Sequence, residues 1–191
     1  MKNPKAEDRR VRRTKAALRR GLVELMTTKP LGDITVKELA EQSDVSRGTF
    51  YKYYTDIAGM CDTIKTDIAA ELREIVDKHV DGESDFPRDL FVNIYSFLGR
   101  NSDFRVLFMS SSGNGSFVDS IVSIIRHRFE DEFKASLRSL DLRQLDYFFS
   151  YISSGCIAMF GVWIAHGMKE TPEEMADITV KLMVGAVSAI S

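Results

Sequence analysis

Cysteine is scarce in this chain of 191 residues, which has only two, Cys61 and Cys156, far apart and in no CxxC pair. Small secreted domains are held together by several disulfides, and structural zinc sites use closely spaced cysteine pairs. The sequence favours neither arrangement. We therefore expect two reduced thiols, a cytoplasmic protein, and no bound metal or other cofactor.

Long apolar runs are also missing. The longest, CIAMFGVWIA at 156–165, has about half the length that a membrane-spanning helix needs. The charged N-terminal stretch has no apolar segment typical of a secretory signal. We expect no membrane partner.

Proline and strand-like alternation are rare as well. The chain has only 4 prolines, and no stretch alternates apolar and polar residues with a period of two. Helix-forming residues dominate instead. The predicted fold class is all-α.

The three histidines, His79, His127 and His166, lack the neighbours that catalysis or metal binding requires. No nucleophile, base or second ligand stands near them at a suitable spacing. We expect that the protein is not an enzyme.

Charge is distributed unevenly along the chain. Residues 1–56 carry 13 Lys+Arg and 8 Asp+Glu, a net of +5, whereas residues 57–191 carry 13 and 20, a net of −7; together they give −2. Nine of the cations fall within residues 1–20. A basic first third on an acidic body indicates a polyanionic partner for that part alone. The alternative is an ordinary solvated basic helix face.

The basic region shows helix signals at helix-turn-helix spacing. Apolar residues at helical intervals predict a helix over 7–26, and Thr35 followed by Glu38 forms a capping box that opens a helix over 36–42. Asp44 can take the left-handed conformation that ends a helix, and Ser46 is a good N-cap for a helix over 47–53. Two short helices joined by a tight turn match the DNA-binding helix-turn-helix.

The rest of the chain is predicted to form a helical body. Asp56 can cap a helix reaching about Val80, and Thr171-Pro172-Glu173-Glu174 is a clear helix start. Further helices are expected over 86–100, 103–110, 116–139, 141–167 and 172–190, with SSSGNGS at 110–116 as a loop. The expected domains are a three-helix DNA-binding domain, 1–56, and a helical regulatory and dimerisation domain, 57–191.

The segment DVSRGTFYKYY at 44–54 supplies chemistry suited to duplex DNA. Arginine can bond bidentately to guanine, glycine lets the backbone approach a groove, and hydroxyls and lysines bond phosphates. The candidate DNA-binding residues are Thr35, Lys37, Ser46, Arg47, Gly48, Thr49, Tyr51, Lys52 and Tyr53. The alternative is that the aromatic residues are the core of a helical hairpin without DNA function.

The run RRTKAALRRGLVELMTTKPLGDITVKELAEQSDVSRGTFYKYYTD, with Val45-Ser46 and Gly48-Thr49-Phe50-Tyr51, resembles the DNA-binding domain of the TetR family of bacterial transcription regulators. The segment YFFSYISSGCIAMFGVWIAHGMKETPEEMADITVKLM, 147–183, resembles the C-terminal domain of the group related to the DhaS activator of dihydroxyacetone kinase genes. Three positions depart from the family pattern: Ser43-Asp44 replaces Ala-Gly, Tyr53 replaces His, and Ile57 replaces a Lys that would hold a phosphate.

The resemblance implies a homodimer that uses its last two helices as the interface and reads a palindromic operator, most often as a repressor. Small residues at four-residue spacing are compatible with close helix approach; the alternative is packing within one monomer. The candidate interface residues are Ser154, Ala158, Val162, Met175, Ile178, Leu182 and Gly185.

A small-molecule effector is the last implied partner. Apolar and aromatic residues of the body could line a pocket for a small apolar ligand, or could simply be core. The candidates are Phe91, Tyr95, Phe108, Phe149, Cys156 and Phe160. A competing function is a helical dimer that acts as a coactivator through protein partners; strongly salt-dependent binding to duplex DNA would separate the two.

Overall fold

The computed structural model describes residues 4–78, 86–109, 118–124, 126 and 141–190. These residues are mostly helical and include no strand, which confirms the all-α prediction. The helix predicted over 116–139 and the loop at 110–116 lie largely outside the described residues, although 118–124 and 126 are helical.

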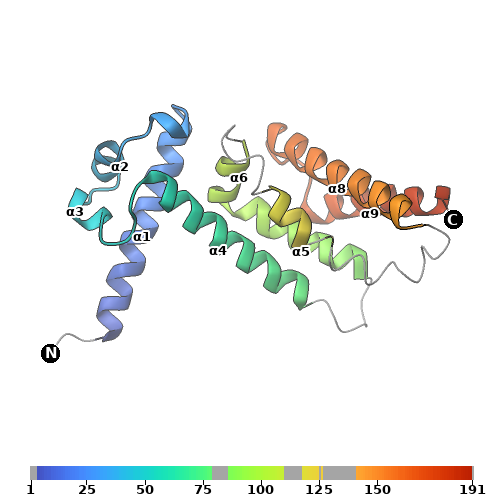
Figure 1. Cartoon of the computed structure of the whole chain (residues 1–191), viewed down its shortest axis with the longest axis horizontal. Helices are drawn as coiled ribbons and strands as arrows, with labels where there is room; N and C mark the ends of the chain where they lie inside the picture. Colours follow the sequence, from blue (N-terminus) through green and yellow to red (C-terminus); the bar gives the residue numbers. More distant parts are fainter. Residues whose placement is uncertain (1–3, 79–85, 110–117, 125, 127–140, 191) are drawn as a thin grey trace. The chain divides into compact units, whose positions relative to one another are not determined.

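The described elements follow the predicted order closely. In chain order they are α1 Pro4–Met26, a 3-10 turn Leu31–Asp33, α2 Val36–Gln42, α3 Arg47–Phe50, α4 Ile57–Asp77, α5 Phe86–Arg100, α6 Ser102–Met109, α8 Leu142–Ala165 and α9 Pro172–Ile190 (Figure 1). The chain divides into two compact units, Met1–Ile68 with Ser102–Asn114, and Ala69–Asn101 with Gly115–Ser191. We call them unit 1 and unit 2.

Unit 1 holds α1, α2, α3, the first half of α4, and α6. Leu18 and Leu22 of α1 are buried together with Leu39 of α2 and Phe50 of α3. Gly21 permits the close approach of α1 to α2, because a Cβ there would lie 2.3 Å from Oγ of Ser43. This packing fixes the helix-turn-helix against the second half of α1.

An ion-pair cluster joins three helices of unit 1. The guanidinium of Arg19 on α1 pairs with the carboxylate of Asp67 on α4 and lies 3.8 Å from that of Asp103 on α6. The Tyr54 hydroxyl is buried, and burial raises its pKa. These partners are distant in sequence, so the cluster links elements that local signals cannot relate.

Unit 2 is built around α5 and α9. The Arg88 Nε of α5 donates to Asp177 of α9 at 2.7 Å, and the buried hydroxyls of Tyr95 and Thr179 lie 2.8 Å apart. Gly99 of α5 makes room for the ring of Trp163 of α8, since a Cβ there would lie 2.9 Å from that ring. Trp163 is therefore packed inside the unit.

The Trp163 indole N–H donates to the carbonyl of Glu170 at 3.0 Å, beyond the end of α8. That end is closed by two backbone hydrogen bonds. The Gly167 amide donates to the Ile164 carbonyl and the Met168 amide donates to the Trp163 carbonyl, and both donor residues have a positive φ. This pair of hydrogen bonds is the pattern of a Schellman cap. It reverses the chain into α9, whose start has the predicted capping box between Thr171 and Glu174.

Candidate nucleic-acid interface

The turn between α2 and α3 is closed by the conformation predicted at Asp44. Its φ is 51°, the left-handed region. The amide of Val45 donates to the Ala40 carbonyl at 3.0 Å and that of Asp44 to the Glu41 carbonyl at 3.2 Å. A Schellman cap thus ends α2, and an aspartate occupies the left-handed position usually filled by glycine.

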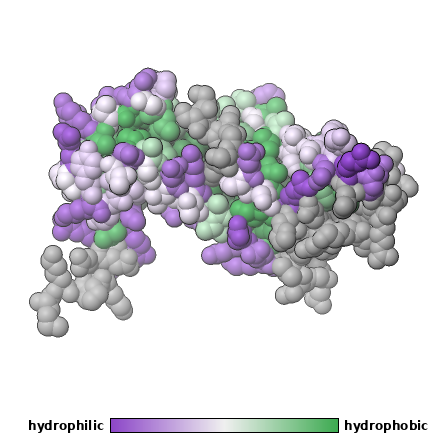
Figure 2. All heavy atoms as spheres, viewed as in Figure 1, coloured by the Kyte–Doolittle hydropathy of each residue, from purple (hydrophilic) through white to green (hydrophobic). Residues whose placement is uncertain are grey.

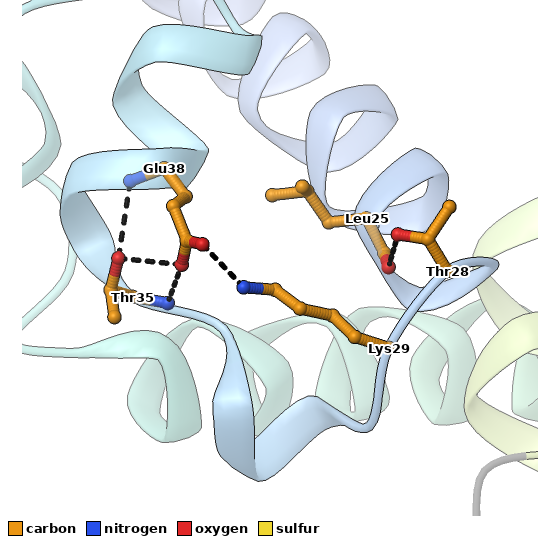
Figure 3. A network of polar contacts seen from close by, with 5 residues as sticks. All are labelled: Leu25, Thr28, Lys29, Thr35 and Glu38. Atoms are coloured by element: carbon orange, nitrogen blue, oxygen red, sulfur yellow. Dashed lines mark hydrogen bonds and ion pairs between the residues drawn. The ribbon is translucent and has the colours of Figure 1, made fainter.

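The start of α2 is held by a network with Glu38 at its centre (Figure 3). The Thr35 hydroxyl donates to Glu38 at 2.7 Å and accepts from the Glu38 amide at 3.2 Å, while Lys29 Nζ donates to the other carboxylate oxygen at 2.5 Å. The Lys29 and Thr35 hydrogen bonds lower the pKa of Glu38 to about 2. The Thr35 hydroxyl and the Thr35 amide, which donates to Glu38 at 2.9 Å, are therefore both engaged in capping.

The start of α3 uses its hydroxyls in the same way. Ser46 Oγ accepts from the Thr49 amide at 3.1 Å and lies 2.8 Å from the Thr49 hydroxyl. The helix is shorter than predicted, ending at Phe50, because the amides of Lys52 and Tyr53 bond the carbonyls three residues back. The prediction of a helix through 53 was wrong: residues 51–53 form turns.

Four of the candidate DNA-binding residues lie exposed around α3. Arg47, Gly48 and Lys52 are exposed, and Tyr51 is 52 % exposed. Phe50 between them is fully buried and packs edge-on against the Tyr51 ring, with 5.5 Å between centroids. A Cβ at Gly48 would approach nothing closer than Ser46 Oγ at 3.8 Å. Figure 2 shows hydrophilic residues along the left edge of unit 1, where Figure 1 places α2 and α3.

The two remaining candidates lie at the margins of this surface. Lys37 is 71 % exposed and reaches Glu41 only at 4.0 Å, so its ammonium is available to another anion. Tyr53 is half-buried, with Lys15 Nζ 5.9 Å from its ring centroid. Ile57, where the family pattern has a lysine, is 9 % exposed and begins α4 as a core residue.

The candidate pocket residues fall in both units. Phe108 lies in unit 1, where its ring centroid is 5.6 Å from that of Phe104. In unit 2 the Tyr95 ring centroid is 6.4 Å from those of both Phe91 and Phe160. Phe149 is also buried, beneath the guanidinium of Arg126 at 5.5 Å.

Burial also raises the pKa of one tyrosine hydroxyl in unit 2 and of both cysteine thiols. Burial raises the pKa of Tyr95 to about 12 and that of Cys156 to about 11. The pKa of Cys61 in unit 1 is raised to about 11 for the same reason. No group of His, Cys, Asp or Glu among the described residues has the arrangement of a metal site.

Most candidate interface residues form an exposed face on α8 and α9. Val162 is 54 %, Ile178 42 % and Leu182 61 % exposed, and Ser154, Ala158 and Gly185 are exposed too. Met175 instead is 5 % exposed and buried in unit 2. Sequence reasoning missed Tyr147 and Tyr151, which are 76 % and 69 % exposed and continue the α8 face at four-residue spacing. The sequence prediction of this face was based on small residues at four-residue spacing, and therefore did not include tyrosines.

Within the described ranges one helix, Arg143–Ala165, has the length and apolar composition of a membrane-crossing helix, and only 22 % of its most apolar stretch is buried. Length and composition alone are weak evidence for a membrane span. Some apolar residues of this helix, such as Val162, belong to the exposed face, whereas others, such as Trp163, are buried in unit 2.

A basic helix-turn-helix with its recognition residues exposed, joined to a helical body, is typical of DNA-binding transcription regulators. The model of the TetR transcriptional regulator C-terminal region matches residues 85–185, slightly more than half of the chain. The chain belongs to the TetR family of transcription regulators. A comparison with curated proteins gave no match.

Solved structures of this family share the fold. The fatty acid degradation regulator FadR from Bacillus halodurans has a TM-score of 0.72 at 12 % identity, covering 97 % of both chains. The dihydroxyacetone kinase operon activator DhaS has 0.57 at 14 %, covering 92 % of this chain and 97 % of its own. Thermus thermophilus FadR, a repressor in complex with lauroyl-CoA, has 0.59 at 18 %, covering 89 % and 93 %. At these identities the likeness concerns the fold alone.

Proposed function

We propose that this TetR-family regulator is a cytoplasmic repressor that binds a palindromic operator as a homodimer, with 1–56 as its DNA-binding domain and 57–191 as its regulatory and dimerisation domain. The observation that carries this is the exposure of Arg47, Gly48 and Lys52 beside a helix start that is capped by other residues. The N-terminus of α3 would point Arg47 and free backbone amides at a base edge or phosphate.

The exposed face of α8 and α9 supports the dimer. A second copy would bury Val162, Ile178 and Leu182 in a four-helix arrangement, while small residues such as Ala158 and Gly185 allow close approach. A twofold axis would also present two recognition helices, and half-sites about one DNA turn apart would follow. Met175, being buried, takes no direct part.

The aromatic interior of unit 2 supports a small apolar effector. Phe91, Tyr95 and Phe160 form a contiguous apolar cluster with Cys156 on the same helix as Phe160. One structural relative holds lauroyl-CoA. Binding of such a molecule would shift helices of the body and release DNA.

The test is selection of random duplex DNA by the purified protein at near-physiological salt. Enrichment of a palindrome, followed by loss of binding when lauroyl-CoA or a free long-chain fatty acid is added, is the expected result. Folded protein that enriches no sequence would overturn the proposed function. In that case the alternative function, a helical dimer that acts as a coactivator by binding a protein partner, would be favoured.

A further inference from the structure

The first half of α1 has no fully buried side chain over residues 9–17. The first buried residue after this stretch is Leu18. In Figure 1 this half of α1 projects beyond α2 and α3. This stretch is packed only in part, with Val11 and Ala17 half-buried, so it gains less than the second half of α1 from the packed face that supplies most helical stability.

This segment is also unusually cationic. Arg9, Arg10 and Arg13 are exposed, and none has an ion-pair partner in the described part of the chain. Arg9 and Arg13 are four residues apart, and Arg10 and Arg13 three, so each pair repels on the helix surface. An anion lying against the segment would relieve this repulsion.

A contact near the middle of α1 fixes where this segment lies within unit 1. Lys15 is placed 5.9 Å from the ring centroid of Tyr53, in the turns that follow the recognition helix. From there to Pro4 the helix extends for about 17 Å at 1.5 Å per residue. The arginines therefore begin beside the recognition segment and continue away from it.

We propose that Arg9, Arg10 and Arg13 form a second DNA contact that binds phosphates flanking the bases read by α3. The three side chains lie on one exposed face of the helix, within about 100° of arc, and form a compact cationic patch that suits charge neutralisation better than the reading of base edges. This inference rests on the proposed function and adds a sequence-independent contact to it.

The experiment compares the slope of log Kd against log salt for the selected palindrome and for a scrambled duplex of equal length. The test variant carries Arg9→Gln, Arg10→Gln and Arg13→Gln, since glutamine keeps helix propensity while removing charge. A second variant replaces the same residues with lysine. The matched control carries Arg73→Gln, Arg100→Gln and Lys169→Gln, which are exposed cations of unit 2.

Each lost phosphate contact lowers the slope by about 0.9, and a bound homodimer loses six, so the slope for the glutamine variant should fall by roughly 5 units, with at least about tenfold lower affinity at 0.1 M salt. The loss should be equal on both duplexes. The lysine variant and the unit 2 control should match the unchanged protein. An unaltered slope, with circular dichroism showing intact folding, would overturn the inference, as would a loss confined to the palindrome.

Failure of the proposed function gives a different result. If the unchanged protein selects no sequence but the glutamine variant lowers its slope on random duplex, the second contact stands and the operator-binding proposal falls. If the unchanged protein binds no duplex at any salt concentration, both fall.

Discussion

Unit 1 and unit 2 each expose a surface that the single chain leaves uncovered, but the two surfaces differ in chemistry. The unit 1 surface is cationic, with Arg47 and Lys52 exposed in the recognition segment and further arginines exposed on α1, whereas the unit 2 surface is apolar and includes exposed Val162 and Leu182. Salt screens and displaces the contacts of the first, but strengthens burial of the second if the anion is sulfate or phosphate. We therefore expect that the proposed DNA binding and self-association can be separated by solution conditions alone.

The most severe way to break this comparison is to charge the apolar face. Val162→Glu with Leu182→Glu would bury four unpaired carboxylates across a symmetric dimer, because each substitution occurs twice. We expect the dimer dissociation constant to rise at least about 1000-fold, equivalent to roughly 4 kcal/mol, as measured by analytical ultracentrifugation.

Palindrome affinity should fall with the dimer in that variant, whereas non-specific binding by monomers should persist. The control is Lys169→Glu, at an exposed position of the α8–α9 connection. A variant pair that stays dimeric would place the interface elsewhere.

The next effect concerns the cationic surface at the tip of α3. Arg47→Ala should weaken operator binding by about 1–3 kcal/mol and relax the preference at one base pair, as measured by fluorescence anisotropy on single-base operator variants. Thermal stability and dimerisation should not change, because Arg47 is exposed and outside the apolar face.

Gly48→Ala is the matched comparison, since its Cβ meets no atom of the chain closer than 3.8 Å. It should leave the fold intact and weaken DNA binding through the groove alone. An equal loss on every duplex after Arg47→Ala would instead identify Arg47 as a phosphate contact.

A smaller effect is expected where α1 meets α2. Gly21→Ala places a methyl group 2.3 Å from Ser43 Oγ, and overpacking of this kind costs about 1–3 kcal/mol, offset by about 1 kcal/mol of helix propensity. Urea unfolding should show this loss. Adding Ser43→Ala should restore most of it, because Ser43 Oγ is buried without a hydrogen bond in the described structure. Additive losses in the double variant would contradict this close contact.

The smallest effect is the pH dependence set by Glu38. Its pKa is lowered to about 2 in the folded chain, so its stabilising contribution is present above the unfolded value near 4.5 and is lost as pH falls towards 2. Glu38→Gln should flatten the stability profile between those values, measured by thermal melting at stepped pH. Glu41→Gln, on the exposed side of α2, is the control and should leave the profile unchanged.

The helix caps could be predicted from the sequence because each cap depends on residues only three positions apart. Thr35 with Glu38, Ser46 before α3 and Asp56 before α4 all make the expected bonds, the last with the Gly59 amide at 2.7 Å. Asp44 takes the left-handed conformation that its side chain tolerates. The all-α fold and the surface expected to face DNA follow from the same short-range patterns.

Contacts between distant segments were beyond sequence reasoning. The ion pairs of Arg19 with Asp67 and Asp103, and the support of Glu38 by Lys29, depend on the path of the chain. Burial of Met175 was missed for a similar reason, because apolar spacing marks a face without saying what covers it. The shortness of α3 depends on turn bonds at Lys52 and Tyr53 that helix propensity does not reveal.

The division of labour in the helix-turn-helix has a consequence for how such a regulator can evolve. Thr35, Ser46 and Phe50 hold the fold, whereas Arg47, Gly48 and Lys52 contribute little to it. If the second group reads DNA as proposed, we expect substitutions there to change what is recognised without a loss of folding stability. A duplicated copy of this chain could therefore drift to a new operator through a series of stable intermediates.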